Sequence, residues 1–227
     1  MAHCILVSSN TQVIYTLKFD PSVPSLELEH ESHVGYHPSW ITSYPGDKSL
    51  IFTGLEHQEG QVVAVTFDDS GKGTVAKQIT SGGSDPCSLV ATKDELHVAN
   101  VRLSNPYISC VRLQNASQYS GGGVALVPIS NTPPYLLAPS PSYMLEVSGS
   151  GPNKDRQQTS HPHQVVLIEG YSELLVPDLG ADKVWRFKKN QQSSDGQEGC
   201  QWSLEGHITY EPGCGPRHVV FYGIYTF

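Results

Sequence analysis

The sequence predicts an all-β fold, a partial β-propeller of about four blades that are each a four-stranded antiparallel sheet. The strongest observation is an internal repeat: a proline shortly before an apolar run occurs four times, and such self-similarity marks repeat architectures. The repeated prolines are Pro38, Pro86, Pro162 and Pro216. They lie 48, 76 and 54 residues apart, and a four-stranded propeller blade takes about 40 to 50 residues. Glycine (21) and proline (16) are abundant and only 16% of residues are charged, which indicates a turn-rich chain.

The first blade expected along the chain lacks its first strand. Residues 4–8 and 13–19 are apolar runs that predict the second and third strands of this blade. Three further units follow, and each begins with the proline segment as its first strand. A polar turn, two apolar strands and a weaker, more polar strand then complete the antiparallel sheet. The predicted second strands are 49–53, 95–99 and 172–176, the third strands are 61–67, 123–129 and 182–187, and the fourth strands include 74–79 and 201–206.

The C-terminal residues begin one more unit. Residues 215–220 repeat the proline segment, and residues 222–227 follow it without the remaining strands. We therefore expect a single incomplete propeller domain over residues 1–227. Residues 101–118 stand where the other units have a short turn, so they predict an insertion. The segment begins with Val101, and valine codons begin with GT. It ends with Gln118, and one glutamine codon is CAG, so the segment has the ends of an unremoved intron. Two interpretations stay open, an unremoved intron in a longer gene and a surface loop.

The charge balance limits the partners of the protein. The formal net charge is −8, from 14 Lys and Arg against 22 Asp and Glu, so neither a nucleic acid nor an anionic membrane surface is expected. A small anionic molecule remains a candidate where cations gather locally. No segment resembles a signal peptide or reaches the roughly 20 apolar residues of a membrane span. Five cysteines without metal-type spacing predict buried free thiols in a cytoplasmic protein.

The register of the repeat predicts a site. The first strand of every blade lines the central channel of a propeller, so equivalent positions converge near the axis. The residues that directly follow the four prolines are Ser39, Cys87, His163 and Arg217. A histidine accepts protons near neutral pH, and an arginine offers a fixed fork of donors to a carboxylate, a phosphate or an oxyanion. The alternative is that both are polar channel residues bridged by water.

Metal and cofactor motifs are weak in this chain. His161 and His163 form a His-x-His pair that could ligate a metal, but a third ligand is not evident, so no metal is expected. Residues 178–183 are too short for a calcium loop and predict a tight hairpin with Gly180 at its special backbone position. The glycines near residue 150 lack the strand-to-helix context of a nucleotide-binding loop. No cofactor is therefore expected.

Several motifs in order carry a family resemblance. They are Gly151-Pro152-Asn153 with Arg156-Gln157, then His161-Pro162-His163, then residues 177–184, and then residues 213–218. Together they resemble the seven-bladed β-propeller lactonase family, which includes propeller-type 6-phosphogluconolactonases and fungal carboxymuconate lactonizing enzymes. The resemblance implies a seven-bladed propeller, of which this chain holds a part, with its site in the central channel.

The resemblance also implies roles for individual residues. His163 or its neighbour His161 would take a proton from the attacking water, and Arg217 would hold an anionic group or the oxyanion. The expected catalytic residues are thus His161, His163 and Arg217. The expected substrate-binding residues are Arg156, Asp178, Asp182 and His218.

The function expected from these residues is hydrolysis of a sugar-acid lactone, such as 6-phosphogluconolactone. Two alternatives stay open, a carboxy-cis,cis-muconate cyclase and a propeller that binds a ligand without catalysis. The family places an acidic residue and a further arginine after the segment that matches residues 213–218, and this chain ends before both. If those groups are required, the chain as written is expected to be inactive.

Overall fold

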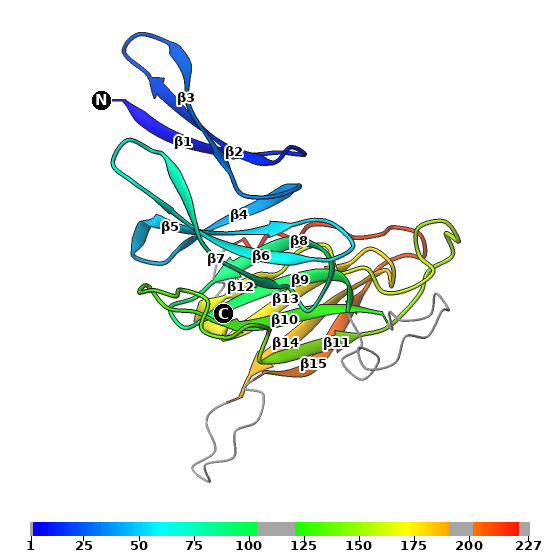
Figure 1. Ribbon diagram of the computed structural model, residues 1–227. Coiled ribbons are helices and arrows are strands. Elements are labelled where there is room, and N and C mark those ends of the chain that lie inside the picture. Colours follow the sequence, from blue (N-terminus) through cyan, green and yellow to red (C-terminus); the bar gives the residue numbers. More distant parts are fainter. Residues whose placement is uncertain (1, 104–120, 191–201, 223–227) are drawn as a thin grey trace.

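The computed structural model describes residues 2–103, 121–190 and 202–222 (Figure 1). Within these residues the chain forms one three-stranded and three four-stranded antiparallel sheets, with strands in sequence order. The all-β prediction and the four-stranded blade are confirmed. The strands are β1 (His3–Ser8), β2 (Val13–Asp20) and β3 (Ser25–His33); β4 (Pro38–Tyr44), β5 (Asp47–Leu55), β6 (Gln61–Phe67) and β7 (Gly73–Thr80); β8 (Gly83–Ala91), β9 (Glu95–Leu103), β10 (Gly122–Pro128) and β11 (Tyr143–Val147); β12 (Val166–Ile168), β13 (Glu173–Asp178), β14 (Lys183–Lys189) and β15 (Trp202–Thr209).

The positions of two outer strands, β3 and β11, were not predicted from the sequence. An outer strand of a blade faces solvent on much of its surface, so it lacks the apolar run that identifies an inner strand. In β3 the two leucines, Leu26 and Leu28, are 61% and 55% exposed and alternate with charged residues. The first sheet consists of β1, β2 and β3, and within the described residues no strand pairs with the other edge of β1.

The strand β9 runs into the segment that was predicted to be an insertion. Ser84 pairs with Arg102, and Gly83 pairs with Leu103, so residues 101–103 continue the sheet. Residues 104–118 lie outside the described residues.

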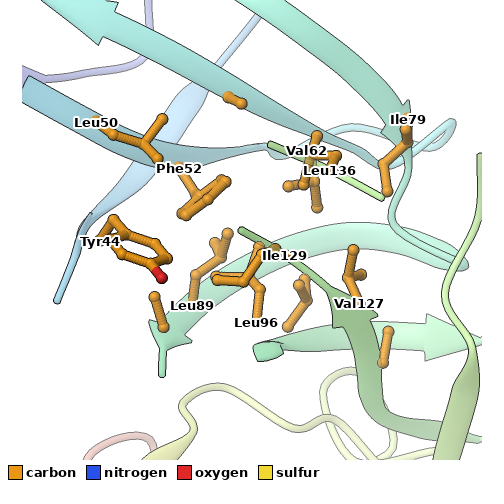
Figure 2. Packing of buried hydrophobic residues seen from close by; sticks show 14 residues of the cluster. Tyr44, Leu50, Phe52, Val62, Ile79, Leu89, Leu96, Val127, Ile129 and Leu136 are labelled. Atoms are coloured by element: carbon orange, nitrogen blue, oxygen red, sulfur yellow. The ribbon is translucent and has the colours of Figure 1, made fainter. Parts of the chain in front are cut away.

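The hydrophobic core is divided among the spaces between neighbouring sheets. One cluster lies between the β4–β7 and β8–β11 sheets, and Figure 2 shows Phe52, Leu89 and Leu96 meeting there. A second cluster, which includes Leu174, joins the β8–β11 and β12–β15 sheets. A third, which includes Ile14, joins the first sheet to the second. Blades packed face to face around an axis bury their apolar surface in this way.

The proline segments do not all become regular strands. The first two lie in β4 and β8, as predicted. The third pairs irregularly with β13, through an isolated bridge between Pro162 and Asp178 and a hydrogen bond from His163 N to Pro177 O of 2.9 Å. The fourth, residues 215–220, was expected to be a first strand but lies in no strand, because no second strand pairs with it among the described residues.

The cysteine prediction is only partly correct. Cys87 is buried, whereas Cys4 and Cys214 are exposed, and all three are free thiols. The remaining two cysteines lie outside the described residues. No helix in the described ranges has the length and apolar character needed to cross a membrane.

Candidate active site

The structure brings His163 and Arg217 into contact. Nη2 of Arg217 lies 2.5 Å from Nε2 of His163, although the residues are 54 positions apart. The His218 ring stands edge-on to the His163 ring, with 5.4 Å between the centroids. His163 is half-buried, whereas Arg217 and His218 are exposed. The proximity expected from the repeat register is therefore present, with the guanidinium on the solvent side of the imidazole.

The His163 imidazole is neutral in this arrangement. A guanidinium carries only donors, so Nε2 must accept the hydrogen bond and the ring proton must reside on Nδ1. Burial, which has the larger effect, and the positive charge of Arg217 together lower the pKa of His163 to about 4. Nδ1 is buried and has no hydrogen-bond partner among the described residues. The ring is thus held as an uncharged base beside a fixed cation.

Neighbouring segments fix the backbone of His163. The thiol of Cys87, at the equivalent position of the preceding blade, lies 3.4 Å from Pro162 O and 3.5 Å from His163 O. Burial raises the pKa of that thiol, so it stays protonated. The hydroxyl of Ser39, the equivalent residue one blade earlier, is buried and has no hydrogen-bond partner among the described residues.

Asp182 holds the segment that carries Arg217. Its Oδ2 accepts Gly213 N at 2.8 Å, and its Oδ1 accepts Gly215 N at 2.8 Å. The buried amide of Gln157 donates to the same carboxylate at 2.7 Å. Burial raises the pKa of Asp182, but these hydrogen bonds outweigh it and leave the pKa below its usual value. These three hydrogen bonds give Asp182 a positioning role, and the substrate-binding role expected for it stays a prediction.

Asp178 is also structural rather than substrate-binding. It is fully buried, and Oδ1 accepts the backbone N–H groups of His161, Gly180 and Ala181 at 2.7 to 3.1 Å. Oδ2 accepts Ser160 Oγ at 2.5 Å and Trp185 Nε1 at 2.8 Å. Five donors saturate this carboxylate, so no acceptor remains for a ligand.

The hairpin after β13 differs from the prediction in one detail. The left-handed residue is Asp182, with φ of 52°, and not Gly180. Gly180 is required for another reason, since a Cβ there would overlap the carbonyl oxygen of Thr159. The glycine therefore allows a close backbone approach between the hairpin and the segment before His161.

His161 and Arg156 lie in a second group, separate from the contact between His163 and Arg217. Nδ1 of His161 is 3.5 Å from Arg156 O, and burial lowers the pKa of His161. Both residues line a small polar pocket of about 190 Å³ together with Arg102. Arg102 was not predicted, because it lies inside the presumed insertion and no motif marks it. No group of three or more metal-ligating side chains occurs within the described ranges.

Successive four-stranded sheets with a histidine and an arginine meeting at the proline segments define a β-propeller with a compact polar site. The chain matches the family model described as "Lactonase, 7-bladed beta-propeller" over residues 4–226, so it belongs to that family. The family expected from the motifs is confirmed.

Two curated relatives are 6-phosphogluconolactonases by name. The chain is 26% identical over 216 residues to the "Probable 6-phosphogluconolactonase" of Arthroderma benhamiae, which covers 95% of this chain and 48% of the relative. It is 24% identical over 213 residues to the 6-phosphogluconolactonase of Bacillus subtilis, which covers 92% of this chain and 52% of the relative. The chain thus spans about half the length of the curated relatives it matches.

Solved structures show the same fold. A Bacteroides fragilis protein superposes with a TM-score of 0.75 at 25% identity. The superposition covers 96% of this chain and 57% of the Bacteroides fragilis chain. The Pseudomonas aeruginosa periplasmic gluconolactonase superposes with a TM-score of 0.71 at 22% identity and covers 97% of this chain and 59% of its own. The second likeness shows the fold alone.

Proposed function

We propose that this protein hydrolyses the ester bond of a sugar-acid lactone, and that 6-phosphogluconolactone is its substrate. The observation that carries the proposal is the contact between the neutral His163 imidazole and the Arg217 guanidinium. The names of the relatives from Arthroderma benhamiae and Bacillus subtilis support the substrate class.

The proposed mechanism uses these two side chains. When the lactone carbonyl approaches, the exposed Arg217 guanidinium turns from His163 Nε2 to the carbonyl oxygen. Nε2 then accepts a proton from a water molecule, and the water oxygen bonds to the carbonyl carbon. Arg217 stabilises the resulting oxyanion. The tetrahedral intermediate collapses with cleavage of the ring C–O bond, and the His163 imidazolium returns its proton to the leaving ring oxygen.

The charge of Arg217 couples its position to the basicity of His163. In the free site the cation lowers the pKa of His163, which makes the ring a weak base. An oxyanion on Arg217 offsets that positive charge, so the pKa of His163 rises as the transition state forms. The base therefore strengthens when the proton must be taken, which favours catalysis near neutral pH.

The test is acid release from 6-phosphogluconolactone by the 227-residue chain, compared with the spontaneous rate. We expect the chain to exceed the spontaneous rate, and His163→Gln to reduce the catalysed rate about 100-fold or more. His33→Gln is the matched control, because His33 is exposed on β3, away from the site. A rate for the unmodified chain equal to the spontaneous rate would overturn the proposal. Consumption of carboxymuconate without lactone hydrolysis would assign the chain to the cyclase instead.

A further inference from the structure

The pocket beside His161 lies where the end of β9 meets the segment that precedes β12. Val101 and Arg102, at the end of β9, form one wall, and residues from 155–161 form the other. Gly122 at the start of β10 permits this approach, because a Cβ there would overlap Pro162 and lie 2.7 Å from Val101 O. The opposite wall is anchored through Asp178, which accepts His161 N at 2.7 Å. Both walls are therefore positioned by buried contacts.

Two cations in this pocket lack partners. Arg102 and Arg156 are exposed, and among residues 2–103, 121–190 and 202–222 their guanidinium groups form no hydrogen bond or ion pair. Arg186, by contrast, is paired with Glu173 at 2.5 Å. Asp155 is the one acidic residue on the described lining, whereas two guanidinium groups and the His161 ring lie on the same lining. This local excess of cations occurs in a chain of net charge −8.

We propose that this pocket binds the phosphate group of a phosphate monoester through Arg102 and Arg156. A guanidinium presents paired N–H donors that match phosphate oxygens, and the two guanidinium groups outnumber the Asp155 carboxylate on the same lining. Thr159 and His161 add further polar groups to the lining. The volume of about 190 Å³ corresponds to roughly six water molecules, which leaves room for a phosphate and retained water.

The pocket and the site of the proposed function lie on one proline segment. His161 and His163 are two residues apart on this segment, and two residues of chain span at most about 7 Å. A sugar phosphate with its phosphate beside His161 would therefore direct the rest of the molecule toward His163. This placement rests on the proposed function, whereas phosphate binding by the pocket does not. The pocket would make the enzyme select phosphorylated over unphosphorylated lactones.

Binding to the 227-residue chain, measured by titration calorimetry, tests the proposal without requiring catalysis. The probes are 6-phosphogluconate, gluconate and inorganic phosphate. We expect 6-phosphogluconate to bind at least tenfold more tightly than gluconate. Arg102→Gln and Arg156→Gln should each lower the affinity for 6-phosphogluconate about tenfold and leave the affinity for gluconate unchanged. Lys154→Gln is the matched control, because Lys154 is an exposed cation on the same loop but not on the pocket lining.

Other outcomes have defined meanings. Inorganic phosphate that binds the unmodified chain but not the double variant Arg102→Gln, Arg156→Gln supports recognition of the phosphate group itself. Equal affinities for 6-phosphogluconate and gluconate would overturn the proposal, and so would full phosphate binding by the double variant with an unchanged circular dichroism spectrum. Lactone hydrolysis without preference for the phosphorylated substrate would overturn the proposal of a phosphate-binding pocket and would support the proposed lactonase activity. Phosphate binding without lactone hydrolysis would support the phosphate-binding pocket and overturn the proposed lactonase activity.

Discussion

Asp182 Oδ1 accepts the backbone N–H of Gly215 at 2.8 Å, and this bond joins segments that are 33 residues apart. Gly215 lies two residues before Arg217, so the carboxylate fixes the start of the segment that carries the guanidinium. Asp182 thereby links the hairpin after β13 to the candidate active site.

Replacing Asp182 with Asn should move Arg217 away from His163. The amide loses one acceptor oxygen, so at least one of the bonds to Gly213 and Gly215 is lost. We expect lactone hydrolysis to fall about tenfold, and the pKa of His163 to rise because the guanidinium no longer stands beside it. Kinetics and an NMR titration of the His163 ring measure both effects. An exposed carboxylate, changed as Asp69→Asn, is the control, and an unaltered His163 pKa in Asp182→Asn would contradict the positioning role.

The pH dependence of stability should report His163. Its pKa is about 4 in the folded chain and about 6.5 in an unfolded one. Between these values the unfolded chain binds a proton that the folded chain does not, so the free energy of unfolding decreases as the pH falls from about 6.5 toward 4. Arg217→Gln removes one cause of the low pKa and should make this decrease smaller. Urea unfolding of the unmodified chain and of Arg217→Gln at pH 7 and pH 5 measures this difference. An equal decrease in the free energy of unfolding between the two pH values in both proteins would refute the effect of Arg217 on the His163 pKa.

Asp178→Asn should destabilise the chain strongly. The buried carboxylate accepts five hydrogen bonds, and an amide in its place directs an NH₂ group at some of those donors. We expect a loss of about 3 kcal/mol in the free energy of unfolding, measured by the urea midpoint. A loss below about 0.5 kcal/mol would show that the site tolerates the amide.

Gly180→Ala should be far more harmful than Gly170→Ala. A Cβ at Gly180 would overlap Thr159 O, whereas one at Gly170 would meet nothing within 4 Å. We expect Gly180→Ala to cost about 2 kcal/mol and Gly170→Ala to change stability little. Thermal unfolding of the two variants measures the contrast. Similar melting temperatures would argue against the close approach of the hairpin to Thr159.

The three described cysteines should differ in reactivity. Cys4 and Cys214 are exposed, whereas Cys87 is buried and burial raises the pKa of its thiol. Brief alkylation of the folded protein should modify Cys4 and Cys214 and leave Cys87 unmodified until urea is added. Mass spectrometry of the digested protein identifies the sites. Labelling of Cys87 at the rate of Cys4 under native conditions would contradict the observed packing.

Most of the inner strands were predictable because their apolar runs recur with the prolines. The positions of the outer strands β3 and β11 were not predictable, since the stability of these strands comes from pairing with a neighbour rather than from their own apolar residues. The fourth proline segment shows the opposite case, in which a strand was predicted from the sequence and none is present. Its sequence matches the repeat, but a strand needs a partner, and among the described residues no second strand pairs with it.

The repeat register anticipated that His163 and Arg217 would lie close together, because equivalent positions of neighbouring blades converge. The roles of Asp178 and Asp182 were not predictable. The donors to each carboxylate are mostly backbone N–H groups, which any residue supplies and no sequence pattern marks. Arg156 was predicted as a substrate-binding residue, but its pocket with Arg102 was not predicted, since the absence of a side chain at Gly122 lets the walls of the pocket approach each other.

The division of the core among the spaces between sheets also determines how the protein opens. Each of the two interior sheets packs against a neighbour on both faces. Among the described residues, the β1–β3 sheet shares a core cluster with one neighbour, through Ile14, and the β12–β15 sheet shares one through Leu174. In such a nearest-neighbour array unfolding proceeds from the end inward. The amides of β2 should therefore exchange with deuterium before those of β9, through fraying that leaves the histidine and arginine pair intact.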